Sequence, residues 1–593
     1  MSDKFTDNCD AWNPGLNSTI PQTLNPLITL YRNENAFIEY AEAKELSDFC
    51  GLRPAELIAL RPERLLIHEL LIRVSSDLSV PDGPAYEDLG INLRRMVKTI
   101  YDTEVRSAMP ALIMEFETCK DKAGSFIEEQ LSEQIFKICG KNDQQKQASN
   151  NYWWQRFFSS KTTDKKVTAT QAPELTALTH WKSQLIETRD PLKKSCLKAL
   201  VNVIGAMIGH RGKILPDPAL ITKLATNQVC NQHGSAMLGK LTEPLIKTAA
   251  AREGYRYLPI QSSPVIMNVK GASASGKSTI RPQQTYLAQR LGIPWQDFAL
   301  ISPDYWRKYL LDYNSLDENY KYAAMLTGQE LEIIDRKLDR YMAEKAKANK
   351  MSHLLIDRFR FDSFTVDSGG SMDSRLLSRF GEQIFMFFMV TPPAETVSRA
   401  WSRGKTTGRY KAVDDLLYHN VEAFTGMPAL FFSWILSDEK KLRFEFLDND
   451  VPLGQKPKTA AFGWNNALTI LDIDLMLNID LYRKVNIEAS VPGDIFKDSD
   501  RDTLANTDFL IRCLTDIQDV TIADQNTATI YARLKDGQLI ECNHEYLNAL
   551  PADHNLKVIL KAISQKAESS LTLTHESVID IKQQKHYTLG AWG

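Results

Sequence analysis

The sequence contains no pair of cysteines at the close spacing of a metal-binding or redox motif. Its eight cysteines are scattered along 593 residues, and a chain of this length can bury a hydrophobic core without disulfide bonds. Apolar runs are also short, because the longest, residues 384–390 and 429–436, fall far below the ~20 residues that a membrane-spanning helix needs. We therefore expect free thiols in a reducing compartment and no membrane partner.

The sequence also lacks an excess of either charge. Lysine and arginine total 71 and aspartate and glutamate total 74, so the net charge of −3 does not favour nucleic acid as a partner. The ten histidines show no metal-binding spacing such as HExxH, which argues against a zinc site. Met1–Lys4 leads into polar residues without the apolar core of a signal peptide, and this predicts a cytoplasmic protein.

Periodicity and composition divide the chain into five segments around one α/β core. Residues 1–140 and 174–260 have the apolar spacing of helices, and the second of these is expected to pack on the core. Residues 261–455 alternate strand, loop and helix, which predicts a parallel sheet. The polar stretch 141–173 is interpreted as a linker and 456–593 as a small mixed α/β module. The expected fold class is thus an α/β core with a parallel sheet, preceded by a large mainly α-helical region.

The strongest motif follows the apolar strand predicted at residues 264–270. It fits the pattern of a P-loop or Walker A motif, and its residues are Gly271, Ala272, Ser273, Ala274, Ser275, Gly276, Lys277, Ser278 and Thr279. Small residues let consecutive backbone N–H groups curve around phosphate oxygens, and the following helix adds the positive end of its dipole. The motif predicts nucleotide binding, with Lys277 at the β- and γ-phosphates and the Ser278 hydroxyl on Mg²⁺. Pro282 predicts a kink in the first turns of that helix.

Two carboxylates follow later strands of the expected sheet. Asp304 comes directly after the strand at 298–302, and Asp357 ends the strand at 352–357. Carboxyl ends of parallel strands face the ligand crevice, so Asp304 is the candidate catalytic base for a substrate hydroxyl. Capping of a helix at 305–311 is its alternative role. Asp357 is similar to the last residue of a Walker B strand and is the second candidate Mg²⁺ ligand, with turn formation as the alternative.

A basic segment, residues 402–410, ends the helix expected after the buried strand at 383–390. It holds two glycines, two threonines and three cations, a composition that suits a mobile lid over ATP. Arg403 and Arg409 are the candidates for stabilising charge on the transferring phosphoryl group. A solvated surface turn is the alternative interpretation of this segment.

Residues 262–450 resemble the zeta toxin family of P-loop kinases and its relative chloramphenicol phosphotransferase. Four motifs carry the resemblance, and in chain order they are the loop Gly271–Thr279, Asp304 followed by Arg307, Arg403 with Arg409, and the strand end Asp448-Asn449. The resemblance implies a P-loop kinase domain in which Asp304 is the catalytic base and Arg307 belongs to the substrate site. It also implies that the lid arginines act on the phosphates and that Asn449 lies near the adenine of ATP.

One segment departs from the pattern of that family. Family members tend to have a small glycine- and threonine-containing segment after the Walker B-like aspartate, whereas this chain has Arg358 and Arg360. That segment helps to shape the sugar-nucleotide pocket of the toxins, so UDP-N-acetylglucosamine is not favoured as the acceptor. The two arginines indicate an anionic acceptor or an additional clamp on phosphate.

These observations favour an ATP- and Mg²⁺-dependent kinase, a phosphotransferase that acts on a hydroxyl of a small molecule, a nucleotide sugar or a macromolecule. The alternative is a nucleotide-gated interaction protein, in which the P-loop is a switch without turnover and the helical N-terminal region binds a protein partner. A polynucleotide kinase is a third class, disfavoured by the near-neutral net charge. The large helical region also suits an effector delivered into a host cell.

Overall fold

The computed structural model describes residues 9–85, 87–137, 172–357, 381–438, 440–551, 554–563, 571–572 and 577–592. Arg358 and Arg360 lie outside these residues, as does nearly all of the predicted linker at 141–173. The chain forms two compact units. The helical unit comprises Pro21–Leu71 and Val97–Gly254, and the sheet unit comprises Met1–Ile20, Ile72–Met96 and Tyr255–Gly593. The five-segment division of the sequence remains a prediction.

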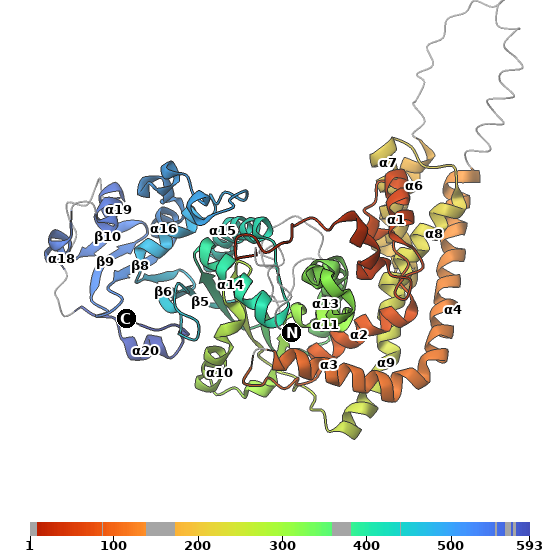
Figure 1. The fold of residues 1–593 in the computed structure, drawn as a ribbon, viewed down its shortest axis with the longest axis horizontal. Helices are drawn as coiled ribbons and strands as arrows, with labels where there is room; N and C mark the ends of the chain where they lie inside the picture. The colour runs from red at the N-terminus through yellow and green to blue at the C-terminus, as the bar shows by residue number, and fades with distance from the viewer. Residues whose placement is uncertain are drawn as a thin grey trace, which may run out of the picture. The chain divides into compact units, whose positions relative to one another are not determined.

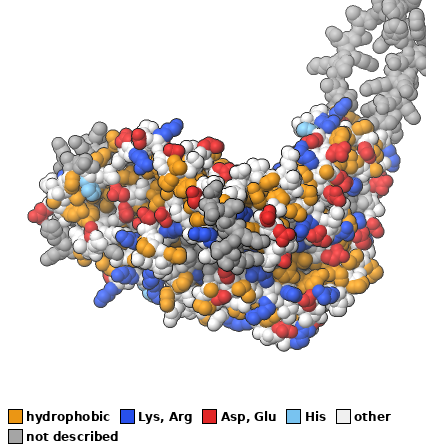
Figure 2. Space-filling model, in the orientation of Figure 1, with side chains coloured by type: hydrophobic (Ala, Val, Ile, Leu, Met, Phe, Trp, Pro, Cys, Tyr) orange, Lys and Arg blue, Asp and Glu red, His pale blue; other side chains and the backbone are white. Residues whose placement is uncertain are grey.

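The order of secondary structure follows the expected one. The described residues up to Glu253 form helices and no named β-strand, and a mixed α/β region follows from Val265 (Figure 1). Within the described part of the chain, every helix is too short or too polar to span a lipid bilayer. On the face drawn in Figure 2, positive and negative side chains are interspersed, as the near-neutral composition leads one to expect.

The helical unit is built from helices with clear start and stop signals. Its helices are α1 (Tyr40–Cys50), α4 (Arg106–Leu131), α6 (Pro173–Glu187), α7 (Pro191–Arg211), α8 (Pro218–Val229) and α9 (Ser235–Glu253), while α2 (Pro62–Asp77) and α3 (Asp88–Ile100) run from one unit into the other. Asp190 and Asp217 cap α7 and α8 by accepting backbone N–H bonds, and a proline follows each cap. Gly212 ends α7 at a φ of 71° in the left-handed region.

The apolar residues of α7 form the centre of the helical core. Its four central side chains are at most 1% exposed, and they are Leu197, Leu200, Val203 and Ile204. Trp181 of α6 is fully buried in the same cluster, whereas Leu185 and Leu192 pack at its margin. The helical spacing expected for residues 174–260 thus has its physical cause in this core.

The sheet unit contains one mixed sheet, which has eleven strands among the described residues. The strands are β1 (Val265–Gly271), β2 (Phe298–Ile301), β3 (His353–Asp357), β4 (Gln383–Val390), β5 (Lys441–Asp448), β6 (Lys458–Trp464), β7 (Ala467–Ile470), β8 (Asp519–Ala523), β9 (Ile530–Lys535), β10 (Gln538–Cys542) and β11 (Leu571–Thr572). The helices are α10 (Arg281–Arg290), α11 (Arg307–Leu310), α12 (Ala323–Leu326), α13 (Gly328–Lys347), α14 (Pro393–Thr407), α15 (Val413–Ile435), α16 (Ile473–Tyr482), α17 (Asp508–Asp516), α18 (His544–Ala549), α19 (Asn555–Ile563) and α20 (Ile581–Lys585).

Five neighbouring strands, in the order β2-β3-β1-β4-β5, are parallel and form the core of the sheet. Beyond β5 the pairing becomes mixed, beginning with the antiparallel pairs β5–β6 and β6–β7. The chain leaves β1 towards β2 on one side and later returns to β4 on the other. The carboxyl end of β1 therefore lies at the point where ligand crevices form in α/β sheets.

Both faces of the parallel core are covered, which explains why its strands are apolar almost throughout. On one face Phe385 and Phe387 of β4 share a cluster with Leu287 of α10. On the other face Phe431 of α15 packs edge-on against Phe388 of β4, with ring centroids 5.9 Å apart. Neighbouring residues of a strand point to opposite faces, so Phe387 and Phe388 anchor the two layers separately.

A buried carboxylate ties β5 to a segment far along the chain. Glu445 is fully buried and accepts hydrogen bonds from the backbone N–H of Leu589 (2.7 Å) and of Gly590 (3.0 Å) and from the hydroxyl of Thr459 (2.8 Å). Burial raises the pKa of the Glu445 carboxyl, and these hydrogen bonds act in the opposite direction. The late segment is thereby fixed against the core of the sheet.

Candidate functional site

The glycine-rich loop connects the carboxyl end of β1 to α10. Gly271 is the last residue of β1, and a short 3-10 turn, Lys277–Ile280, precedes the regular helix that begins at Arg281. Pro282 lies in the first turn of α10, where a proline removes no helical hydrogen bond. Pro282 therefore gives no reason for a kink inside α10, and the 3-10 turn ends before the proline.

Two glycines of the loop are required by the space around them. A Cβ on Gly271 would lie 2.7 Å from the Ser275 hydroxyl and 2.8 Å from the carbonyl oxygen of Met389. Gly276 has a φ of 92°, and a Cβ there would overlap the side-chain amide of Asn449. The spacing of the motif thus corresponds to two places where the backbone approaches its neighbours closely.

The loop is anchored from the two neighbouring strands. The carbonyl oxygen of Ser275 accepts hydrogen bonds from Asn449 Nδ2 (2.7 Å), just past β5, and from the Thr391 hydroxyl (2.9 Å), just past β4. Arg399 of α14 in turn donates to the carbonyl oxygen of Asn449 (2.7 Å). Sequence reasoning identified Asn449 but missed Thr391, whose only signal was its position at the end of a buried strand.

Lys277 and Ser278, the residues predicted to bind phosphate and Mg²⁺, both make hydrogen bonds within the site. The Lys277 ammonium donates to the carbonyl oxygens of Gly271 (3.1 Å) and Ala272 (2.7 Å). The Ser278 hydroxyl donates to Asp357 Oδ2 over 3.0 Å, so the two candidate Mg²⁺ ligands are direct neighbours. Mg²⁺ is commonly held by one or two protein oxygens beside substrate phosphates, and a serine hydroxyl beside a carboxylate fits this chemistry.

Asp304 lies in a 3-10 turn, Pro303–Trp306, directly after β2. Its carboxylate pairs with Arg307 Nε over 3.0 Å and with Arg409 Nη2 over 2.6 Å. Burial alone would raise the pKa of the Asp304 carboxyl, but the charges and hydrogen bonds of Arg409 and Arg307 hold it well below its usual range. The alternative role as a helix cap is wrong, because Ser302 occupies the cap position and Asp304 makes no capping bond to the helix backbone.

Arg307 is itself held firmly at the site. Its Nη1 group donates to the Ala324 carbonyl oxygen (2.5 Å) and to the Thr327 hydroxyl (2.9 Å), while its Nε group faces Asp304. The guanidinium therefore links the turn after β2 to the start of α13. This arrangement positions the Asp304 carboxylate.

The basic segment 402–410 forms the end of α14 and a tight reversal. Gly408 has a φ of 73° and ends the helix, and Tyr410 folds back onto Gly404, where a Cβ would lie 2.5 Å from the tyrosine ring. This reversal carries Arg409 to Asp304. The composition of the segment thus has a local structural cause, and its role as a mobile lid remains a prediction.

The charges of these residues act on Lys277. Burial lowers the pKa of its ammonium, and the cations Arg403 and Arg409 lower it further, whereas Asp357 and Asp304 raise it. Every residue predicted for catalysis within the described part of the chain therefore belongs to one electrostatic cluster at the carboxyl edge of the sheet. Arg358 and Arg360 lie outside the described residues.

Three residues that sequence reasoning missed belong to the same neighbourhood. Lys411 forms an ion pair with Asp415 (3.2 Å) and contacts His419 Nδ1. The charges of Lys277 and Asp304 both act on His419. The four-residue spacing of the three side chains was a signal that they share one helix face, but nothing in the sequence placed that face beside the loop.

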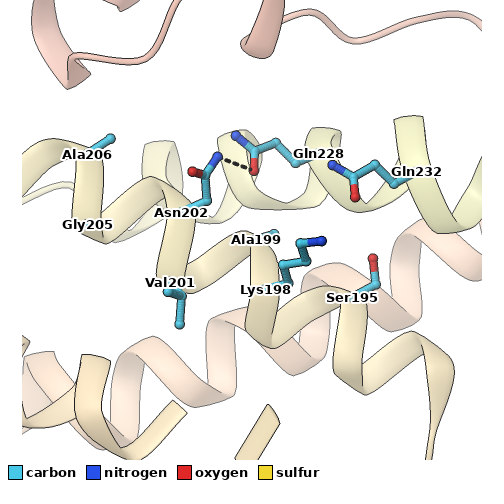
Figure 3. Close-up of a pocket in the computed structure, with 9 residues that line it drawn as sticks. All are labelled: Ser195, Lys198, Ala199, Val201, Asn202, Gly205, Ala206, Gln228 and Gln232. Atoms are coloured by element: carbon cyan, nitrogen blue, oxygen red, sulfur yellow. Dashed lines mark hydrogen bonds between the residues drawn. The ribbon is translucent and has the colours of Figure 1, made fainter. Parts of the chain in front are cut away.

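The helical unit holds a separate cavity of about 500 Å³. Its lining residues are Ser195, Lys198, Ala199, Val201, Asn202, Gly205, Ala206, Gln228 and Gln232. Figure 3 shows the side chains of Asn202 and Gln228 directed at each other, joined by a hydrogen bond of 3.1 Å. None of the residues predicted for nucleotide binding lines this cavity.

Comparisons with known proteins add no identification. No protein-family model matches the chain, and no curated protein and no solved structure matches it significantly.

Proposed function

We propose that the protein is an ATP- and Mg²⁺-dependent phosphotransferase that transfers the γ-phosphate to a hydroxyl group of an acceptor, as its resemblance to the zeta toxin family implies. The observation that carries this proposal is the meeting of two pairs at one sheet edge: Ser278 with Asp357, and Asp304 with Arg409. The first pair suits a metal ion and the second suits a reacting phosphoryl group. A chance glycine turn would have no reason to lie beside either pair.

Each residue then has a separate task. The loop N–H groups and Lys277 bind the phosphates, and Ser278 with Asp357 would hold Mg²⁺, which neutralises charge on the phosphates. Asp304 orients the acceptor hydroxyl and receives its proton as the oxygen attacks the γ-phosphorus, while the bond to the β-phosphate oxygen breaks. Arg403 and Arg409 stabilise the charge on the transferring group.

One observation favours the second candidate, a nucleotide-gated interaction protein. The Asp304 carboxylate is engaged by two guanidinium groups, and a carboxylate with a strongly depressed pKa is a weak proton acceptor. Such a site could bind a nucleotide and respond to it without turnover. The two candidates agree on nucleotide binding and differ on phosphate transfer.

Binding and turnover are tested with one pair of proteins. Lys277→Ala should weaken Mg²⁺-dependent ATP binding by at least about 30-fold in calorimetric titration, because a buried charged partner of phosphate is lost. Lys441→Ala, which removes a lysine at the amino end of β5, is the matched control and should bind ATP like the natural protein. Incubation with ATP labelled at the γ-phosphate and a cell extract then separates the candidates. Label in an acceptor supports the phosphotransferase, and ATP binding without any transfer supports the switch.

A further inference from the structure

A lysine just before α15 lies between two partners that the helix presents on one face. Lys411, which lies just before the helix, pairs with Asp415 Oδ2 over 3.2 Å, and its ammonium contacts His419 Nδ1. His419 Nε2 lies 3.7 Å from Asp415 Oδ1. The side chains of Lys411, Asp415 and His419 are 16%, 30% and 23% exposed, so the group is only partly open to solvent.

The lysine is charged and its position is fixed. Burial lowers the pKa of the Lys411 ammonium to about 8, and the carboxylate of Asp415 works against that shift. Burial together with the charge of Lys411 lowers the pKa of His419 to about 3, so the imidazole is neutral at physiological pH and its Nδ1 accepts a hydrogen bond. An ammonium has three N–H donors, and in the described part of the chain two of them have partners.

Lys411 shares its electrostatic neighbours with Lys277. The charges of Arg403 and Asp304 act on both ammonium groups, although the two lysines come from different elements. Asp304 marks the place where an acceptor hydroxyl meets the γ-phosphate in the proposed reaction. Arg409, which pairs with Asp304 over 2.6 Å, is only two residues before Lys411, so the backbone at Lys411 lies near the Asp304 side of the proposed site.

We propose that Lys411 is a second phosphate-binding lysine, held by Asp415 and His419, which contacts the terminal phosphate of the bound nucleoside triphosphate. This inference rests on the proposed nucleotide-binding function. A plain surface pair at the start of a helix would contribute little and would not need a neutral histidine beside it. Held in this position, Lys411 would bind ATP but not ADP through its ammonium group, because only ATP carries the phosphate that it contacts.

The test compares ATP with ADP on matched variants. Lys411→Ala should weaken ATP binding about tenfold or more and leave ADP binding within about twofold, because one charged hydrogen bond to the terminal phosphate is lost. Lys441→Ala, which changes the same charge elsewhere on the sheet unit, should alter neither. Thermal melting of each variant verifies that it is folded.

The pH dependence gives a second readout that a merely structural lysine would not move. Since the Lys411 ammonium is the charged form, its contribution is present below about pH 8 and is lost as the pH rises above that value. ATP affinity should therefore fall between pH 7 and about pH 9 in the natural protein. Lys411→Arg, which stays charged, should bind ATP with a flatter pH profile. The groups that face Lys411 are Asp415, His419, Arg403 and Asp304, and the lowered pKa values of His419 and Asp304 keep these two groups from titrating in this range.

The outcomes separate the two levels of inference. If Lys277→Ala abolishes ATP binding but Lys411→Ala binds ATP and ADP like the natural protein, the assignment of Lys411 is wrong and the nucleotide site stands. If neither change affects ATP binding, the nucleotide site itself is wrong. If Lys411→Ala does not fold, an unchanged pH profile in Lys411→Arg overturns the assignment, and a flattened profile supports it.

Discussion

The two units use polar side chains in different ways. In the helical unit they join neighbouring segments: Asn231 bonds the carbonyl oxygen of Ile58 (2.6 Å) and the N–H of Leu60 (3.1 Å), and Asn202 bonds Gln228. In the sheet unit, charged side chains from β3, from the turn after β2, from the loop and from the end of α14 meet at one edge. Polar contacts that join two segments hold a fold together, whereas convergence of charge from several segments marks a site.

The largest expected effect comes from a change in the group of charged side chains that meet at the sheet edge. Asp304→Asn should lower kcat for phosphate transfer by about 10²–10⁴-fold, because the amide cannot receive a proton, and should leave ATP affinity within about threefold. Single-turnover measurements with γ-labelled ATP report the rate. Asp48→Asn, an exposed carboxylate of the helical unit that pairs with Lys44, is the control and should leave the rate unchanged. Full activity in Asp304→Asn would show that this carboxylate is not the base.

The second largest effect is expected from a change in the core of the helical unit. Trp181→Ala should reduce the free energy of unfolding of the helical unit by about 3–5 kcal/mol, because it empties a fully buried site and removes the bond from Trp181 Nε1 to Gln130 (3.1 Å). Urea unfolding measures this loss, and calorimetric titration under native conditions should show unchanged ATP affinity. A parallel loss of ATP affinity would mean that the nucleotide site depends on the helical core.

The smallest effect concerns the anchors of the loop. Asn449→Ala removes one of two hydrogen bonds to the Ser275 carbonyl oxygen and should weaken ATP binding by about fivefold, equivalent to about 1 kcal/mol. Thr391→Val removes the other bond and should act in the same direction, while Thr391→Ser retains the hydroxyl and should bind ATP normally. Unchanged affinity in both Asn449→Ala and Thr391→Val would show that the loop keeps its shape without its anchors.

Local signals predicted the elements of the sheet unit well. The strand expected at residues 383–390 is β4 with the same bounds, because an apolar run between a turn and a proline pair leaves little choice. The strand expected at 264–270 is β1, which runs from Val265 to Gly271. These elements depend on neighbouring residues alone, so a single sequence is sufficient for them.

Contacts between residues far apart in the chain were harder to predict from the sequence. The loop motif and the carboxylates after strands were recognised because strand ends gather at one edge, a general rule of parallel sheets. Lys411, Asp415 and His419 were missed, because their four-residue spacing is also that of an ordinary exposed helix face. Asp304 pairs with Arg409 because the chain reverses at Gly408. The two residues are 105 positions apart, and no spacing in the sequence indicates that they meet. The helix-cap alternative for Asp304 was wrong because the cap position of the turn is Ser302, two residues before Asp304.

Glu445 has a consequence for how the protein is made. Its two backbone donors are 144 and 145 positions later in the chain, so a ribosome completes β1, β3, β4 and β5 long before either donor exists. During that interval the middle of β5 contains a carboxylate whose burial costs several kcal/mol without sufficient partners. The core around β5 would thus be completed only after residue 590 has been synthesised, and a product cut short before Leu589 would leave Glu445 buried without its two backbone donors.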